Sequence, residues 1–201
     1  KTEFIPVDSE HFSVWSVIKD HHNSEIEKIF LTASGGPFLN KSIKKNITPS
    51  DAIKHPNWEM GKKISIDSAT LMNKIFEVIE AKKIFDVELK KFDILIHPKS
   101  YIHAIVKFKN GLIKIIAHDT NMKIPISNSI YMGERNLNIF KSKKINLNVL
   151  NSLNLQNVNV KIFPVIKILK KITKGASLFE TVLVSANDEL VSLFLKKKIN
   201  F

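Results

Sequence analysis

The sequence predicts an α+β fold, in which a small mixed sheet and its helices are followed by a linker and a helical C-terminal segment. Two apolar strand patterns, at residues 26–33 and 92–97, are separated by a long helical pattern. A hairpin then follows, because Asn110-Gly111 lies between apolar runs at 101–108 and 112–118. From these features we expect one domain over residues 1–131, a linker over 132–160 and a partial helical domain over 161–201.

The composition is that of a globular protein without disulfides. The 201 residues are 44% hydrophobic and 25% charged, which is enough material for a sizeable core. No apolar run approaches the roughly 20 residues that a membrane span needs, and no secretory signal is visible at the N-terminus. Because the chain has no cysteine, disulfides and thiolate metal sites are excluded.

The formal net charge of +12 raises the possibility of a basic nucleic-acid-binding module or a membrane-surface protein. The basic residues, however, are scattered along the chain, and Arg135 is the only arginine. Proteins that read bases favour arginine for its bidentate fork. We therefore expect neither a nucleic-acid partner nor a membrane partner, and keep nucleic-acid binding as an alternative.

The N-terminal stretch carries two acidic residues close together. Pro6 favours an extended backbone, and if residues 7–10 stay extended, Asp8 and Glu10 point to the same side and could share a hard cation. An Asp-x-Glu pair at a strand end is also common in solvated turns. A short helix is expected over residues 13–19.

Glycines follow the first predicted strand. In Ser34-Gly-Gly-Pro37 the glycines free the backbone to turn its N–H groups toward an anion, and the Ser34 hydroxyl can add a further contact. The same residues are typical of an ordinary tight turn. Both readings, a phosphate contact and a simple turn, remain open on the sequence alone.

The stretch from His55 to Gly61 follows a short predicted helix at 48–54 and has neither helical nor strand periodicity. It nevertheless carries the large apolar residues Trp58 and Met60. A surface loop with such side chains usually covers something, which predicts a lid over a site that is mobile without ligand. The alternative is that Trp58 simply fills the core.

Residues 61–80 predict a short lead-in, a helix cap at Asp67 or Ser68 and then an amphipathic helix. Asn73, Lys74 and Glu77 lie three and four residues apart on its polar face, where they form either a solvated face or part of a site. Further helices are expected at residues 125–131, 164–173 and 178–197. For the histidines His97, His103 and His118, which lie near strand ends, a satisfied structural role is the default.

Four motifs together resemble 1-deoxy-D-xylulose-5-phosphate reductoisomerase. They are Pro6-Val-Asp-Ser-Glu-His11, Ser34-Gly-Gly-Pro-Phe38, His55-Pro-Asn-Trp-Glu-Met-Gly61 and Lys63-Ile-Ser-Ile-Asp-Ser-Ala-Thr70, the last followed by Met72-Asn-Lys74 and Glu77. No single motif is decisive, but their order and spacing are. The likeness covers residues 4–104 strongly and weakens through 131.

The resemblance implies an NADPH-dependent enzyme that converts 1-deoxy-D-xylulose 5-phosphate to 2-C-methyl-D-erythritol 4-phosphate in non-mevalonate isoprenoid biosynthesis. It implies a homodimer in the bacterial cytoplasm or a plastid-like organelle, and a small-molecule sugar phosphate as the partner. A related metal-dependent sugar-phosphate enzyme with a changed substrate is the alternative.

The resemblance also implies that the first domain is the catalytic domain, and it assigns roles to residues there. It implies that Mg²⁺ or Mn²⁺ is held by Asp8, Glu10 and Glu77, which are catalytic together with His55. The substrate is assigned to Ser9, Ser34, His55, Trp58, Ser68, Asn73 and Lys74. The cofactor side is assigned to Met60, Gly61 and Met122, although family members bind NADPH mainly through a preceding domain whose glycine-rich signature this sequence does not contain.

The sequence departs from the family pattern at Thr120, Asn121, Val184 and Asp188. The metal and phosphate motifs are retained in full. We therefore expect this chain alone to bind a divalent ion and a sugar phosphate but not to reduce it with NADPH.

Overall fold

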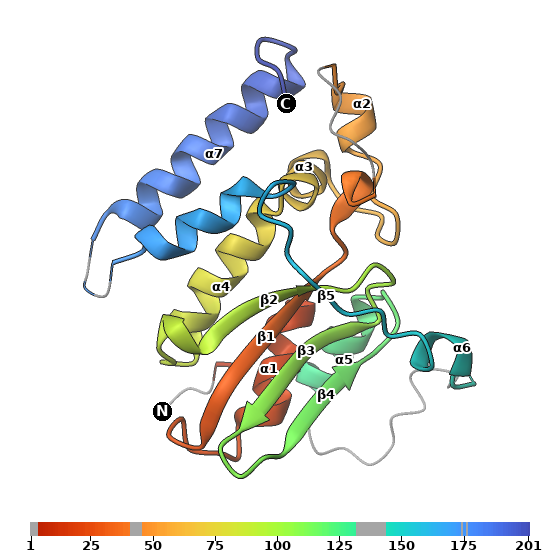
Figure 1. Cartoon of the computed structure of the whole chain (residues 1–201), viewed down its shortest axis with the longest axis vertical. Helices are drawn as coiled ribbons and strands as arrows, with labels where there is room; N and C mark the ends of the chain where they lie inside the picture. Colours follow the sequence, from red (N-terminus) through yellow and green to blue (C-terminus); the bar gives the residue numbers. More distant parts are fainter. Residues whose placement is uncertain (1–3, 41–45, 132–143, 174, 176) are drawn as a thin grey trace.

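The computed structural model describes residues 4–40, 46–131, 144–173, 175 and 177–201. Within them a five-stranded sheet has the order β4-β3-β1-β2-β5 (Figure 1). The central strand β1 (Ile26–Ala33) pairs in parallel with β2 (Phe92–Ile96) and antiparallel with β3 (Ile102–Phe108). The sheet is therefore mixed, and the predicted α+β class is confirmed.

The remaining strands form the two edges. β3 and β4 (Ile113–Ala117) make the predicted hairpin, in which Gly111 has a φ of +90°. The other edge strand, β5 (Gln156–Asn157), pairs antiparallel with β2 and comes from the predicted linker. Of that linker, residues 132–143 lie outside the described residues, and its boundaries stay a prediction.

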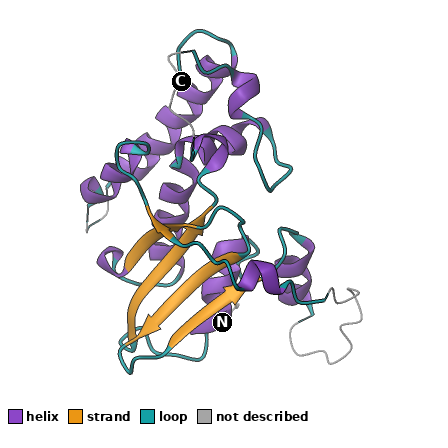
Figure 2. Ribbon diagram, turned by 45° about the vertical axis from the view of Figure 1, so that its right-hand side comes forward, coloured by secondary structure: helices purple, strands orange, loops and turns teal. Residues whose placement is uncertain are grey.

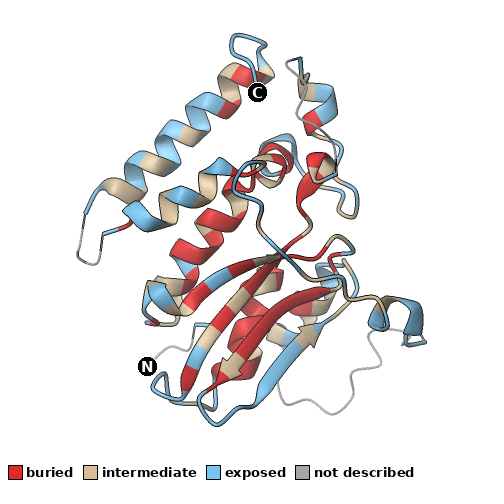
Figure 3. Cartoon of the chain, viewed as in Figure 1, coloured by how far each residue is buried: buried red, intermediate tan, exposed pale blue. Residues whose placement is uncertain are grey.

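Helices surround the sheet and extend beyond it (Figure 2). Helix α1 packs against β3 and β4 and lies behind the sheet in Figure 1, whereas α4 packs against β1 and β2. Buried residues concentrate in α1, α4 and the central strands (Figure 3). The described α-helices are α1 (Ser9–Ile18), α2 (Pro49–Ala52), α3 (Lys62–Thr70), α4 (Met72–Ile84), α5 (Lys123–Ile130), α6 (Leu147–Leu150) and α7 (Phe179–Leu195), with 3₁₀ turns η1 (Gly36–Phe38), η2 (Leu89–Lys91) and η3 (Pro164–Lys171).

The prediction of a short lead-in before the helix was wrong, because Lys62–Thr70 already form the helix α3. The chain breaks at Leu71, which has a left-handed φ of +68° and is almost fully buried, so that α3 ends there and α4 begins with a new direction. The predicted caps were wrong as well, since Gly61 occupies the N-cap of α3. Burial of the Leu71 side chain stabilises a conformation that a non-glycine residue seldom adopts.

The expectation of an extended backbone through Glu10 was also wrong. Asp8 is the N-cap of α1, and its carboxylate accepts hydrogen bonds from the N–H groups of Glu10 and His11, both at 3.1 Å. Glu10 therefore lies in the first turn of a helix, and Asp8 and Glu10 are not arranged along an extended strand.

Beyond the sheet, α7 packs on α3 through the apolar residues Val191, Phe194, Ile66 and Ala69 and through polar contacts around buried Asp67. The Asp67 carboxylate, 2% exposed, accepts from Lys63 Nζ at 2.7 Å and from Asn187 Nδ2 at 2.8 Å. Asp188, one of the departures from the family pattern, pairs with Lys63 at 3.1 Å. In the part of the chain described here, no helix is long and apolar enough to cross a membrane.

Candidate functional site

A cavity of about 280 Å³ lies where the start of α1, the end of β1, the 55–61 loop and the α3–α4 junction meet. It is lined by all but one of the site residues that the sequence predicts, namely Asp8, Ser9, Glu10, Ser34, His55, Trp58, Met60, Ser68, Asn73, Lys74, Glu77 and Met122. The remaining one, Gly61, caps α3 at the end of the 55–61 loop. Segments distant in sequence thus contribute to a single cavity.

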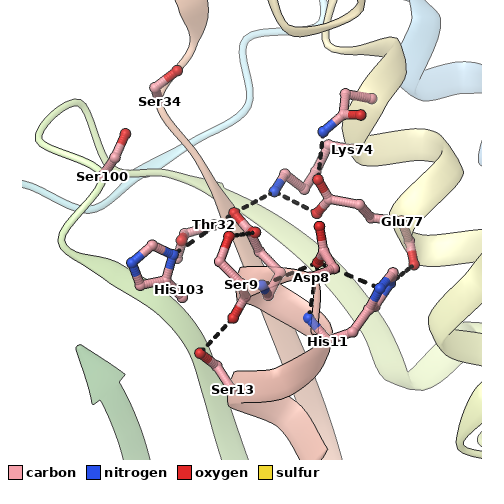
Figure 4. Close-up of polar contacts among 12 residues, drawn as sticks. Asp8, Ser9, His11, Ser13, Thr32, Ser34, Lys74, Glu77, Ser100 and His103 are labelled. Carbon is pink, nitrogen blue, oxygen red and sulfur yellow. Dashed lines mark hydrogen bonds and ion pairs between the residues drawn. The ribbon is translucent and has the colours of Figure 1, made fainter. Parts of the chain in front are cut away.

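Three carboxylates converge at one end of this cavity. Asp8, Glu10 and Glu77 each offer an oxygen, and these oxygens all lie within 4.8 Å of one another. Two sets of contacts fix the arrangement: Asp8 caps α1, and buried His11 donates from Nε2 to the backbone carbonyl of Glu77 at 2.9 Å. The first turn of α1 is thereby held against α4 (Figure 4).

Lys74 lies between two of these carboxylates. Its Nζ donates to Glu10 Oε1 at 2.9 Å and to Glu77 Oε2 at 2.5 Å, and its side chain is almost fully buried (Figure 4). Burial alone would lower the pKa of Lys74, but Glu10 and Glu77 raise it. The ammonium is therefore firmly charged.

The pKa values of the three carboxylates are shifted in different directions by this environment. Burial would raise the pKa of Glu10, yet the Lys74 ammonium and a contact with His103 hold it well below its ordinary value. Burial and the Glu10 charge raise the pKa of Glu77 well above its ordinary value, and burial and Glu10 also raise the pKa of Asp8. Three carboxylates thus share one ammonium, which leaves the cluster short of positive charge.

At the other end of the cavity, hydrogen-bond donors gather around Ser34. The chain leaves β1 and turns through Gly36, whose φ is +64° and where an added Cβ would lie 2.9 Å from Ala69 Cα and 3.0 Å from Ser68 O. Only glycine permits this close approach, which sets Ser34 beside the end of α3. The N-terminus of α4, with Asn73 and Lys74 in its first turn, also reaches the cavity.

The protonation of His55 follows from its contacts. Its Nδ1 accepts from the backbone N–H groups of Asn57 at 3.1 Å and Trp58 at 2.9 Å, so the proton of the neutral ring is on Nε2. Nε2 then donates to Ser34 Oγ at 2.8 Å, and the Gly36 N–H donates to the same oxygen at 3.0 Å. With two donors already bound to its oxygen, Ser34 keeps its own hydroxyl proton for another acceptor. Burial, followed by the Lys74 charge, lowers the pKa of His55 and favours this neutral form.

The apolar wall of the cavity comes from the 55–61 loop and the start of α5. Trp58 is half-buried, with its ring edge toward His103 at a centroid separation of 6.2 Å, while Met60 and Met122 line the same cavity. Trp58 does not belong to the buried core of the described residues. Its place on the cavity wall favours a covering role over that of a core residue.

Sequence reasoning missed the roles of His11 and Asn57. His11 positions the Glu77 backbone, and Asn57 joins the 55–61 loop to the turn after β2, where its Nδ2 donates to Pro98 O at 2.6 Å. Both lie inside the recognised motifs, but their partners are 66 and 41 residues away in sequence. No local periodicity could have shown either contact.

The three strand-end histidines lie behind the cavity. His97 donates from Nδ1 to Leu153 O, His103 donates from Nε2 to His118 O, and His118 donates from Nδ1 to Asp119 O. The rings of His103 and His118 stack at 3.7 Å, and His103 Nδ1 lies 3.9 Å from Glu10 Oε1. All three histidines make the hydrogen bonds expected of structural side chains, and His103 in addition lies close to the Glu10 carboxylate.

A larger depression of about 880 Å³ adjoins Ser34 on the side of η1 and α2. Its wall is formed mainly by prolines, asparagines and apolar side chains, and the acidic cluster is not part of it. The smaller cavity combines ionisable groups with hydrogen-bond donors for an anion. For this reason we take it, and not the larger depression, as the candidate site.

Comparisons with known proteins agree with this geometry. The family model of the 1-deoxy-D-xylulose 5-phosphate reductoisomerase C-terminal domain matches residues 4–85, and that of the DXP reductoisomerase C-terminal domain matches residues 118–201. The chain is 61% identical to the 1-deoxy-D-xylulose 5-phosphate reductoisomerase of Pelagibacter ubique and 40% identical to that of a Sulfurihydrogenibium species. These alignments cover 100% and 99% of the chain but 52% and 53% of the relatives, so the chain spans about half their length.

Solved structures give the same result. The chain is similar to a crystal structure of DOX-P reductoisomerase in complex with NADPH, fosmidomycin and magnesium, with a TM-score of 0.86, 35% identity and coverage of 98% of this chain and 50% of that one. It is also similar to the Zymomonas mobilis enzyme in complex with NADPH, with a TM-score of 0.85, 34% identity and coverage of 97% and 50%. Fold, site motifs and family models agree, and the chain belongs to the 1-deoxy-D-xylulose 5-phosphate reductoisomerase family.

Proposed function

We propose that the protein to which this chain belongs converts 1-deoxy-D-xylulose 5-phosphate to 2-C-methyl-D-erythritol 4-phosphate with NADPH and Mg²⁺ or Mn²⁺. The observation that carries the proposal is the arrangement of one cavity, with three carboxylates at one end and anion donors at the other. A sugar phosphate has matching ends, a carbonyl with neighbouring hydroxyls and a phosphate dianion. The names of the relatives support the same substrate.

The carboxylates of Asp8, Glu10 and Glu77 suit a divalent ion. Carboxylate oxygens are the ligands that Mg²⁺ and Mn²⁺ prefer, and the cluster lacks compensating charge apart from Lys74. A metal bound there would act as a Lewis acid on the substrate carbonyl and hydroxyls. Ser9, whose hydroxyl donates to Glu10 Oε2 at 2.5 Å, lies where it can contact the substrate at this end.

The opposite end suits the phosphate. Ser34 has a hydroxyl proton to donate, Ser68 lines the same cavity, and the N-terminus of α4 carries the positive end of its helix dipole. Asn73 lies in the first turn of α4, and its amide, which donates to Glu77 Oε1 at 2.5 Å, would turn from that carboxylate to reach the phosphate. Lys74 extends from this terminus toward the carboxylates and can compensate charge at both ends. Binding the phosphate orients the reacting carbons, which is how energy from a remote group contributes to rate.

The apolar wall suits the cofactor side. Trp58, Met60 and Met122 would exclude water above the substrate, and Gly61 ends the same loop at the N-cap of α3. NADPH would supply the hydride that reduces the aldehyde formed when the carbon skeleton of the ketose phosphate rearranges. Since the relatives are about twice as long as this chain, we assign most of the dinucleotide contacts to the other half of the protein.

We further propose a homodimer in the bacterial cytoplasm. Ile113 and Ile115 of the edge strand β4 and the preceding Leu112 are between 46% and 57% exposed, and an apolar edge strand is well suited to self-association. The bacterial sources of the relatives support the location.

Calorimetry on the 201-residue chain tests the site. Mn²⁺ and 1-deoxy-D-xylulose 5-phosphate should bind together, Glu77→Gln should abolish the Mn²⁺ dependence, and the surface control Glu27→Gln should not. The same chain should not oxidise NADPH with this substrate, whereas a full-length version should. Failure of the wild-type chain to bind Mn²⁺ would refute the metal assignment, and NADPH oxidation by the 201-residue chain would refute the division of roles.

A further inference from the structure

Asn57 lies in the middle of the 55–61 loop but is bonded to another part of the molecule. Its Nδ2 donates to Pro98 O at 2.6 Å and to Ser100 Oγ at 2.8 Å, both in the turn that follows β2. A carbonyl oxygen can only accept a hydrogen bond, so the assignment of the amide nitrogen to this contact is forced by chemistry. Both hydrogens of the amide thus form hydrogen bonds, and the two acceptors are 41 and 43 residues away in the sequence.

The turn that receives these bonds is itself fixed. The N–H of Ser100 donates to His97 O at 2.9 Å, and the N–H of His97 donates to Ala33 O at 2.7 Å, which ties the turn to the end of β1. His97 is fully buried and also donates from Nδ1 to Leu153 O. Ser100 is 7% exposed and has a φ of +50°, a conformation that surrounding contacts must maintain. Asn57 is therefore attached to a rigid part of the sheet.

On the loop side, Asn57 is connected to the anion end of the cavity. Its backbone N–H donates to His55 Nδ1, the same acceptor that binds the Trp58 N–H. These two bonds orient the imidazole so that Nε2–H points at Ser34 Oγ. Figure 4 shows Ser34 and Ser100 on the two neighbouring segments that leave the sheet, and Asn57 connects the loop to the second of them.

We propose that Asn57 is a positioning residue, which fastens the first half of the 55–61 loop to the Pro98–Ser100 turn and so sets the His55–Ser34 pair for anion binding. Movement of the loop is then confined to the residues after Asn57, and Trp58 moves about a fixed point. The role goes beyond the proposed function because Asn57 does not line the cavity. It rests on that function only in naming phosphate as the anion.

The test uses the 201-residue chain with Mn²⁺ and inorganic phosphate as the probe. Asn57→Asp keeps the shape of the side chain and removes both N–H donors, so phosphate affinity measured by calorimetry should fall about tenfold, comparable to the loss of a buried hydrogen-bonding pair. Asn110→Asp makes the same change in the exposed hairpin turn, where the side chain only accepts a bond from the Leu112 N–H, and should leave phosphate affinity unchanged.

A second measurement reports on the loop directly. The chain has two tryptophans, Trp15 and Trp58, so in a Trp15→Phe background all tryptophan fluorescence comes from Trp58. In that background Asn57→Asp should make Trp58 more accessible to a soluble quencher. Ser100→Ala removes one of the two acceptors and should have a smaller effect, and adding Ser100→Ala to Asn57→Ala should change nothing further.

The outcomes separate the positioning role from a merely structural one. A lower melting temperature with unchanged phosphate affinity and unchanged Trp58 quenching would overturn the proposal. If the wild-type chain binds no phosphate, the proposed function fails, whereas the quenching measurement still decides whether Asn57 fastens the loop. If Asn57→Asp does not fold, Ser100→Ala provides the same comparison with one bond removed.

Discussion

Lys74 is the residue on which both halves of the site depend. Its ammonium contacts Glu10 Oε1 and Glu77 Oε2, and the same two carboxylates belong to the cluster proposed to hold the divalent ion. A metal and the ammonium would therefore compete for the carboxylates, and a phosphate could bind the ammonium that the metal displaces. Binding of the metal and of the anion should then favour each other.

Replacing Lys74 by Met tests this competition. Phosphate affinity should fall about tenfold because a charge-assisted contact is lost, while Mn²⁺ affinity in phosphate-free buffer should rise because no ammonium competes. Calorimetric titrations of each ligand, alone and with the other present, give both values. Lys82→Met, in the last turn of the same helix, serves as the control. A fall in Mn²⁺ affinity would contradict the competition.

His118 makes stability depend on pH. Burial, followed by the charge of His103, lowers its pKa to about 4 from the ordinary 6.5. Below pH 6.5 the unfolded chain takes up a proton that folded His118 does not, so stability present above 6.5 is lost as pH falls toward 4. Replacement by Phe retains a ring that stacks against His103. It should reduce the slope of the free energy of unfolding against pH by the equivalent of at most one proton. Denaturant unfolding across that pH range measures it, and parallel slopes for the two proteins would be the contrary result.

At the scale of elements, the site depends on close contacts between loop and helix. Gly36 lets the chain after β1 touch α3 at Ser68 and Ala69. Leu71 lets α4 start in a new direction immediately after α3, which brings the first turn of α4 to the cavity. These backbone conformations set the distance between the Ser34 side and the Lys74 side.

Gly36→Ala should therefore damage binding as well as stability. The new methyl would force η1 and α3 apart, so phosphate affinity should drop at least tenfold and the free energy of unfolding should fall by about 1–3 kcal/mol. Gly111→Ala is the matched control, since its φ is +90° but nothing lies within 4 Å of the added carbon. It should lose stability through strain alone and keep its phosphate affinity. Equal losses of affinity in both variants would contradict the contact argument.

The contact between α7 and α3 depends on Asn187. Asn187→Ala leaves one oxygen of buried Asp67 without its amide partner, and the free energy of unfolding should fall by about 1–3 kcal/mol. Asp188 is half-exposed and shares Lys63 with Asp67, so Asp188→Asn should cost much less. Urea unfolding compares the two variants. A larger loss in Asp188→Asn would show that the exposed pair, rather than the buried one, holds α7.

At the scale of the whole molecule, the exposed apolar edge at β4 is the surface proposed for dimerisation. Ile115→Lys should shift the protein toward monomer in sedimentation measurements, because burying an unpaired ammonium in an apolar interface is unfavourable. Val182→Lys, on the exposed face of α7, introduces the same charge elsewhere and should leave the association state unchanged. A monomeric wild-type protein would refute the proposed dimer itself.

Much of the architecture followed from local patterns. The hairpin at Asn110-Gly111 and the strands β1, β2 and β3 lie within a residue or two of their predicted bounds, because alternation and turn chemistry are encoded in neighbouring residues. The motifs also named most of the residues that line the cavity. Their roles as ligands stay predictions until binding is measured.

Tertiary structure decided what local patterns could not. The break at Leu71 and the edge strand β5 depend on contacts with distant residues, and neither was predicted from the sequence. The Lys74–Glu10 pair spans 64 residues and the His11–Glu77 bond spans 66. The sequence by itself determined the fold class, the family resemblance and the chemical types at the site. Packing alone decided which of those groups meet, because a buried charge or a strained backbone angle persists only where distant segments surround it.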